Sequence, residues 1–269
     1  MTRVHPSGGL RRSLAAAALI LMATTGCAGA DRAGPRQEPT PDDTLDTAIT
    51  GAMDTAEIPG AIVGVWSPER EYVRAFGIAD TTTGTPMKTD FYHRIGSVTK
   101  TFTATAVLQL AGDGRFGLDD PIGRYVDGVP GGESITVRQL AGMRSGLADY
   151  TRSDGFQAAV AANPRADFTP RQLLDWAFAL PPVSPPDAQV EYCNTNYILL
   201  GLLVEQVTGA SFGDYLSEAI LAPLGMAHTS FPTGTQFPEP HARGYTEPVD
   251  GTGPPVDASG WSAGLTWAA

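Results

Sequence analysis

Cysteine, lysine, basic charge and long apolar runs are all scarce in this sequence of 269 residues. Only two cysteines are present, Cys27 and Cys193, so no disulfide forms within the chain if Cys27 is lipidated. The 18 basic residues are outnumbered by 29 acidic ones, and a net charge of −11 argues against nucleic acid as a partner. The apolar run at residues 14–23 is too short to span a membrane. What remains is a globular composition, large enough for one well-buried domain or two lobes.

The N-terminus has the pattern of an export signal. Three arginines precede the short apolar core, and the segment ends in Ala-Thr-Thr-Gly before Cys27. Small residues before a cysteine resemble a bacterial lipoprotein cleavage site, although Thr24 stands where leucine is usual. An ordinary signal peptide that is cut nearby is the alternative, and Arg11 with Arg12 leaves the twin-arginine route open. Either way, the mature protein is expected to leave the cytoplasm.

We therefore predict three regions along the chain. A lipoprotein-type signal peptide at residues 1–27, lipidated at Cys27, is followed by a proline-containing flexible tether at residues 28–43. The folded domain occupies residues 44–269 and includes a helical lobe at about 118–250. The lipid anchor is the only membrane association expected, at the outer face of the cell membrane. Without the lipid, the protein would be secreted or periplasmic.

Hydrophobic periodicity predicts a strand-bearing start followed by mostly helical structure. The expected elements are helices at 45–53, 97–110, 136–143, 170–180 and about 196–207, with a hairpin made of a buried strand at 61–66 and a second strand at 71–78. Gly112-Asp113-Gly114 is expected to end the second of these helices, and Gly209 the last. Together the elements indicate the α/β class, of the α+β type.

The two lysines are few enough for their positions to be informative. Of the 18 basic residues only Lys88 and Lys100 are lysines, and Lys100 lies three residues after Ser97. Residues at i and i+3 share one face of a helix, so the amine would lie beside the hydroxyl. Unlike arginine, lysine can become neutral and take the proton of a serine nucleophile. A Ser-x-x-Lys pattern alone is more often a surface helix turn.

The structure around Ser97 has two possible interpretations. Threonines alternate with other residues at 99–105, which leaves a strand open. We prefer a helix at 97–110, because the segment is longer than a usual strand. An apolar row and small residues on the other sides predict that this helix is buried almost all round; the row is Val98, Phe102, Ala106 and Leu110. Ser97 would then lie in the first turn, where the helix dipole favours developing negative charge.

Tyr192 and Asn194 form a second polar pair, just before the predicted helix at 196–207. A tyrosine acts as a general base when nearby cations lower its pKa, and an asparagine amide can donate to a substrate carbonyl. Taken singly, Tyr192 reads as a core tyrosine and Asn194 as a helix cap. Their position downstream of Ser97 and Lys100 favours a shared catalytic site.

Taken together, these motifs resemble the serine hydrolase family of class C β-lactamases, D-alanyl-D-alanine carboxypeptidases and related esterases. The resemblance runs from about Leu45 to the last residue. Its motifs lie at 59–61, 95–104, 118–121, 145–147, 192–194, 223–226, 242–245 and 262–264. The family implies an antiparallel sheet flanked by helices, an inserted helical lobe with the cleft between them, and no metal or cofactor.

The resemblance also implies a role for each matching residue. Ser97 would be the acylated nucleophile, and its backbone N–H would form half of the oxyanion hole. Lys100 would help to deprotonate Ser97, and Tyr192 would be the base or proton shuttle. Asn194 would hold the substrate amide. Cys193 stands where the family usually has serine.

One motif of the family is missing. A Lys-Thr-Gly or His-x-Gly sequence normally lies on a strand that lines the cleft, and neither His228 nor His241 fits it. The sequence stops at Ala269, before that strand would begin. We therefore expect a fragment or a truncated product that lacks the final strands, with uncertain activity of its own.

Two other interpretations compete with this one. Residues 260–264 match the nucleophile elbow G-x-S-x-G, but that motif requires a later histidine, and none follows. A non-catalytic cell-surface binding module is the second alternative. Our expected function is a D-alanyl-D-alanine carboxypeptidase-like hydrolase of cell-wall peptides, with a β-lactamase or esterase of the same family as alternatives. Peptidoglycan peptides or small molecules would be substrates, and β-lactams would be ligands.

Overall fold

The computed structural model describes residues 40–248 and 252–267. The predicted signal peptide, the lipidation site Cys27 and most of the tether lie outside these residues. The tether is predicted to reach residue 43, whereas helix α1 (Pro41–Thr55) already begins at Pro41. The chain divides into two units after Leu45, within α1, and all the elements after α1 belong to the second unit. No helix of the described part has the length and apolarity needed to cross a membrane.

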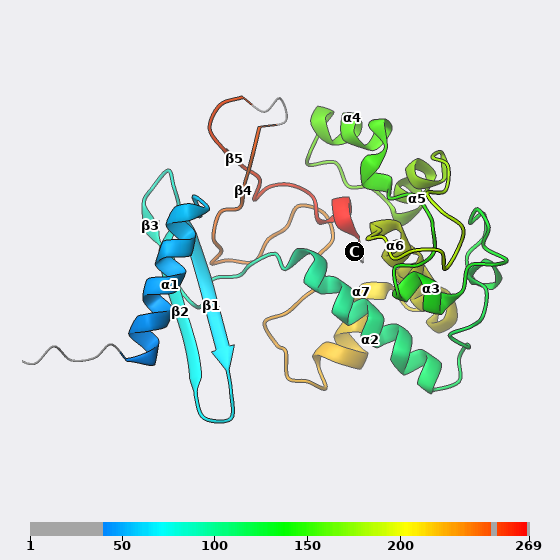
Figure 1. The fold of residues 1–269 in the computed structure, drawn as a ribbon, viewed down its shortest axis with the longest axis horizontal. Coiled ribbons are helices and arrows are strands. Elements are labelled where there is room, and N and C mark those ends of the chain that lie inside the picture. The colour runs from blue at the N-terminus through cyan, green and yellow to red at the C-terminus, as the bar shows by residue number, and fades with distance from the viewer. Residues whose placement is uncertain (1–39, 249–251, 268–269) are drawn as a thin grey trace, which may run out of the picture. The chain divides into compact units, whose positions relative to one another are not determined.

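The predicted hairpin is confirmed as strands β1 (Gly60–Trp66) and β2 (Glu71–Asp80), which pair antiparallel. The short strand β3 (Thr85–Pro86) adds to β2, giving the order β1-β2-β3 (Figure 1). Glycine is required where the hairpin begins. A Cβ on Gly60 would lie 2.1 Å from the carbonyl oxygen of Ile78, and Gly77 has a φ of +67°. The prediction that β1 is a buried strand is wrong, because its residues are only half-buried and Trp66 is 68% exposed.

The predicted helices are present, and side-chain caps explain where two of them begin. Thr136 and Thr169 each form a capping box, before α3 and α5 respectively. The predicted helices have the bounds α2 (Thr99–Gly112), α3 (Val137–Ala141), α5 (Pro170–Phe178) and α6 (Asn194–Thr208). Two further helices were not predicted, α4 (Asp154–Ala162) and α7 (Phe212–Leu216). A π-helical segment, Ser217–Leu221, continues α7.

Helix α6 is the centre of the main core. It is apolar on almost every side, and nine of its 15 residues are buried, as expected for a helix with neighbours all round. It packs against α2, α3, α5 and α7, which surround it in Figure 1. Gly209 ends α6 in the left-handed conformation, with a φ of +74°, as the sequence predicts.

Helix α2 departs from the prediction on one side. A 3₁₀ turn, Gly96–Val98, precedes it, and it ends at the predicted glycines. Ala106, Val107 and Leu110 are buried, but Val98 and Leu108 are exposed. The expectation that α2 is buried almost all round is therefore wrong. Among the described elements, α6, α7 and the π-helical segment contact only part of its surface.

The chain after the π-helical segment is mostly irregular. Strands β4 (Tyr245–Thr246) and β5 (Val256–Asp257) form a separate two-stranded sheet. The helical lobe is predicted to extend to about residue 250; after the π-helical segment, its described residues contain β4 and no α-helix. A final 3₁₀ turn, Ala263–Thr266, is capped by the side chain of Ser262.

Candidate active site

The side chains of Ser97 and Lys100 meet at the start of α2. Lys100 Nζ donates to Ser97 Oγ over 3.0 Å, as their spacing on one helical face predicts. Ser97 lies in the exposed 3₁₀ turn, while Lys100 is only 7% exposed. The exposed Ser97 hydroxyl therefore accepts a hydrogen bond from the buried amine of Lys100.

Tyr192 approaches the same hydroxyl from the start of α6. Its Oη lies 2.6 Å from Ser97 Oγ, across 95 positions of the sequence. The ring also covers Lys100, with Nζ 4.7 Å from its centroid. Tyr192 is 52% exposed, so the alternative of a core tyrosine is wrong.

Asn194 completes the group as the first residue of α6. Its Oδ1 accepts a hydrogen bond from Lys100 Nζ over 2.8 Å. The N-cap of α6 is Cys193, so the alternative of Asn194 as a helix cap is wrong. The four residues predicted from the sequence thus lie together: Ser97, Lys100, Tyr192 and Asn194.

Lys100 is held by neutral groups. Its contacts are the oxygens of Ser97 and Asn194 and the faces of Tyr192 and Tyr197. Within the described residues, no carboxylate forms an ion pair with it. A lysine without a direct counter-ion, bonded to a serine oxygen, is suited to hold or receive the proton of that serine.

A comparison with protein families matches residues 45–268 to Beta-lactamase, which is most of the chain. The chain belongs to the beta-lactamase family. Its sequence is 30% identical over 208 residues to Protein flp of Staphylococcus aureus (strain COL), covering 75% of this chain and 40% of that relative. The chain thus spans about two fifths of the length of this curated relative.

Two solved structures extend the comparison. The D-stereospecific amidohydrolase from a Streptomyces species superposes with a TM-score of 0.74 and 33% identity, over 82% of this chain and 67% of the other. The D-amino acid amidase from Ochrobactrum anthropi SV3, complexed with L-phenylalanine, gives a TM-score of 0.70 and 31% identity, over 84% and 64%. The resemblance inferred from the sequence motifs is therefore confirmed, as is the mixed fold class.

Cys193 does not enter the active site of this beta-lactamase-family protein. Its thiol is buried and donates to the carbonyl of Leu147 over 3.5 Å. Burial raises the pKa of the Cys193 thiol, and the carboxylate of Asp149 raises it further. The thiol is therefore neutral near pH 7 and acts as a small packing group.

The rival nucleophile Ser262 has a structural role. Its Oγ donates to Asp167 Oδ1 over 2.8 Å and accepts from the N–H of Gly264. Neither histidine noted in the sequence lies beside it. His228 contacts Tyr92, and His241 contacts the carbonyl of Pro238. The G-x-S-x-G match in this family member is therefore a turn whose serine is buried and hydrogen-bonded.

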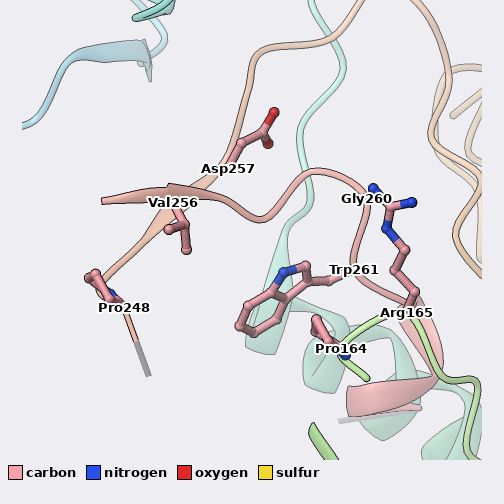
Figure 2. Close-up of a pocket in the computed structure, with 7 residues that line it drawn as sticks. All are labelled: Pro164, Arg165, Pro248, Val256, Asp257, Gly260 and Trp261. Carbon is pink, nitrogen blue, oxygen red and sulfur yellow. The ribbon is translucent and has the colours of Figure 1, made fainter. Parts of the chain in front are cut away.

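Two hollows lie near the segment that leads to Ser97. The larger, of about 980 Å³, reaches Gly96 and Thr99 but none of the four site residues. The smaller, of about 600 Å³, is shown in Figure 2, where the Trp261 ring lies between Val256 and Pro164. Arg94 Nη2 donates to the carbonyl of Trp261 over 2.7 Å and so links this hollow to the start of α2.

One residue of the site has no counterpart in the sequence-based prediction. Asp149 is buried and bonds to both the backbone N–H and the side-chain amide of Asn194. In the sequence, the only hint of this role was that Asp149 is a single carboxylate two residues after the motif at 145–147. A buried carboxylate needs donors, and the turn alone does not show where those donors come from.

Proposed function

We propose that the protein is a serine hydrolase that forms an acyl-enzyme on Ser97 and cleaves an amide bond beside a D-amino acid. The observation that carries this proposal is the double contact of Ser97 Oγ, 2.6 Å from Tyr192 Oη and 3.0 Å from Lys100 Nζ. A serine hydroxyl with two titratable groups in hydrogen-bond reach is placed to pass its proton to one of them, once that group is deprotonated, as it attacks. The family membership supports the same chemistry.

The proposed reaction has two steps. Ser97 Oγ attacks the substrate carbonyl, its proton passes to Tyr192 or Lys100, and the amine leaves with that proton as the C–N bond breaks. Water then attacks the ester, gives one proton back to Ser97 Oγ and releases the acid. The start of α2 favours negative charge on the attacked carbonyl oxygen, through the partial positive charge of its free N–H groups.

The first candidate substrate is a D-alanyl-D-alanine peptide of the cell wall. An exported protein anchored through Cys27, as its N-terminal sequence suggests, would meet such peptides outside the cytoplasm. The second candidate is an amide of a single D-amino acid. It is supported by the two solved relatives at 31–33% identity, one D-stereospecific and one an amidase of D-amino acids.

The test combines a covalent probe with a substrate panel. A fluorophosphonate should label the wild-type protein once, and intact-mass and peptide mass spectrometry should place the adduct on Ser97. Ser97→Ala should abolish labelling, while Ser262→Ala, the matched serine control, should still be labelled. If the folded wild-type protein formed no adduct, the hydrolase proposal would fail and the alternative of a non-catalytic binding module would be favoured.

Steady-state rates then separate the substrates. The panel contains a D-alanyl-D-alanine peptide, D- and L-phenylalanine amide, a chromogenic cephalosporin and a p-nitrophenyl ester. Faster cleavage of the D-amide than of the L-amide would support the stereochemical part of the proposal. Fast ester cleavage with no turnover of peptide or amide would reverse the ranking in favour of an esterase.

A further inference from the structure

Asp149 is a buried carboxylate directly behind the proposed catalytic group. It is 6% exposed, and both of its oxygens accept two hydrogen bonds. Oδ2 accepts from the backbone N–H of Asn194 over 2.9 Å and from its Nδ2 over 3.0 Å. Oδ1 accepts from the N–H and the Oγ1 of Thr151, each over 2.9 Å. Among the described residues no cation pairs with it, so its charge is held by N–H and O–H donors alone.

The contact with Asp149 decides which way the Asn194 amide points. A side-chain amide has one accepting and one donating end, and an ionised carboxylate only accepts. With Nδ2 on Asp149, the carbonyl Oδ1 faces Lys100 Nζ at 2.8 Å. The flipped amide would place oxygen against the carboxylate and NH₂ against the lysine amine. Both contacts would then be repulsive or lost.

We infer that Asp149 is a positioning residue of the active site, which acts on Lys100 through the Asn194 amide. The fixed carbonyl gives Lys100 one acceptor in a set place, and a second of its three N–H donors meets Ser97 Oγ at 3.0 Å. Hydrogen bonds in a chain also polarise one another, so the carboxylate strengthens the acceptor that holds the lysine. This inference rests on the proposed function of Ser97.

A purely structural role would look similar in a static view. The bond from the Asn194 N–H to Asp149 satisfies a free donor at the first turn of α6, and a carboxylate there is favoured by the helix dipole. Loss of that bond would lower stability without a specific effect on chemistry. The experiment therefore has to separate the rate of acylation from the stability of the fold.

The first measurement is acylation of the full-length protein by a p-nitrophenyl ester under pre-steady-state conditions. Asp149→Asn should lower the limiting acylation rate constant roughly 10- to 100-fold. One of the two carboxylate oxygens becomes an NH₂ group, which cannot accept the pair of hydrogen bonds made to that oxygen. The apparent dissociation constant for the ester should change less than about twofold, since Asp149 is buried against the Asn194 amide. Asp175→Asn, an exposed carboxylate on α5 without a side-chain bond, is the matched control and should leave both values unchanged.

The second measurement tests whether Asp149 acts through Asn194. In an Asn194→Ala background, Asp149→Asn should change the acylation rate constant less than about twofold, although it still lowers the Tm. An equal loss in both backgrounds would show general destabilisation and overturn the inference. A wild-type rate in the single variant Asp149→Asn would overturn it as well.

Two further outcomes keep the tests independent. If the wild-type protein forms no acyl-enzyme, the proposed function fails, whatever Asp149 does. If Asp149→Asn does not fold, NMR of the wild-type protein tests whether the Asn194 amide is held by Asp149. The side-chain NH₂ signal of Asn194, assigned by its loss in Asn194→Ala, should be protected from solvent exchange. Exchange at the rate of an exposed asparagine would overturn the inference.

Discussion

The helical part of the molecule and the β1–β2 hairpin are stabilised in different ways. One continuous core runs from α2 to the π-helical segment and contains most of the buried apolar side chains. The small core beside the hairpin has only three buried members, Ala79, Met87 and Ala242. The hairpin depends mainly on backbone pairing, and its side chains Trp66 and Val73 are exposed. The four proposed site residues lie on α2 or α6, or within three residues before the start of one of these helices.

This difference has a consequence for function. Ser97 and Lys100 are positioned by α2, and Tyr192 and Asn194 by α6, and these two helices pack directly on each other. Close-packed interiors hold side chains in single rotamers, whereas exposed strands tolerate change. We expect catalysis to depend on the helix–helix contact and to be insensitive to the faces of the hairpin that are exposed in the structure.

The largest effect is expected for Lys100→Arg. Arginine keeps the positive charge but cannot accept a proton, so the acylation rate should fall about 100- to 10,000-fold. The rate of labelling by a fluorophosphonate, measured by quenched time points on a gel, reports this loss. Lys88→Arg changes the only other lysine, which is exposed, and should label at the wild-type rate. Full-rate labelling of Lys100→Arg would remove Lys100 from the mechanism.

The next effect concerns the core that joins the two catalytic helices. Leu200 on α6 is fully buried, and Leu200→Ala should lower the free energy of unfolding by about 2–5 kcal/mol. Urea unfolding followed by circular dichroism measures the change. Leu108→Ala removes the same atoms from a position on α2 that is 59% exposed and should cost less than about 0.5 kcal/mol. Equal costs would mean that the buried core does not control stability.

A smaller effect is expected in the hairpin. Val73→Ala on β2 removes a side chain that is 36% exposed, so the loss in unfolding free energy should be roughly 0.5 kcal/mol. The acylation rate should stay unchanged. Val204→Ala, the same substitution at a fully buried position on α6, is the control and should cost more. A large drop in acylation with Val73→Ala would show that the hairpin positions the site after all.

The smallest effect concerns the thiol of Cys193. Burial raises its pKa, so in the folded state it stays protonated at a pH where an unfolded cysteine, with a pKa of about 8.5, ionises. The contribution to stability is fully present below that value and declines as pH rises toward the higher folded pKa. Urea unfolding between pH 7 and 9.5 should show a decline that Cys193→Ser reduces. An identical slope in both proteins would contradict the burial effect.

Much of the local structure was predictable because it depends on short-range rules. The hairpin follows from its strand pattern, the start of α5 from Thr169 before a proline, and the end of α6 from Gly209. The contact between Ser97 and Lys100 follows from a spacing of three residues on one helix. These features require only the chain within a few residues of each position.

The failures have a common physical cause. Val98 lies in an apolar row that predicts burial, yet it is exposed, because no described neighbour covers that side of α2. The strand β1 is half-exposed for the same reason. Periodicity shows which residues share a face, but whether that face is covered depends on segments far away in the chain.

By itself, the sequence determined the β1–β2 hairpin and the helices α1, α2, α3, α5 and α6. It also determined the pairing of Ser97 with Lys100 and the family to which the motifs belong. Only the tertiary structure decided that Tyr192 reaches Ser97 across 95 residues, that Cys193 is a buried packing group, and that Asp149 sets the direction of the Asn194 amide. Packing of α2 on α6 brings these groups within hydrogen-bond distance. A hydrogen bond requires two heavy atoms about 3 Å apart, and that separation between distant residues is determined by how the helices pack.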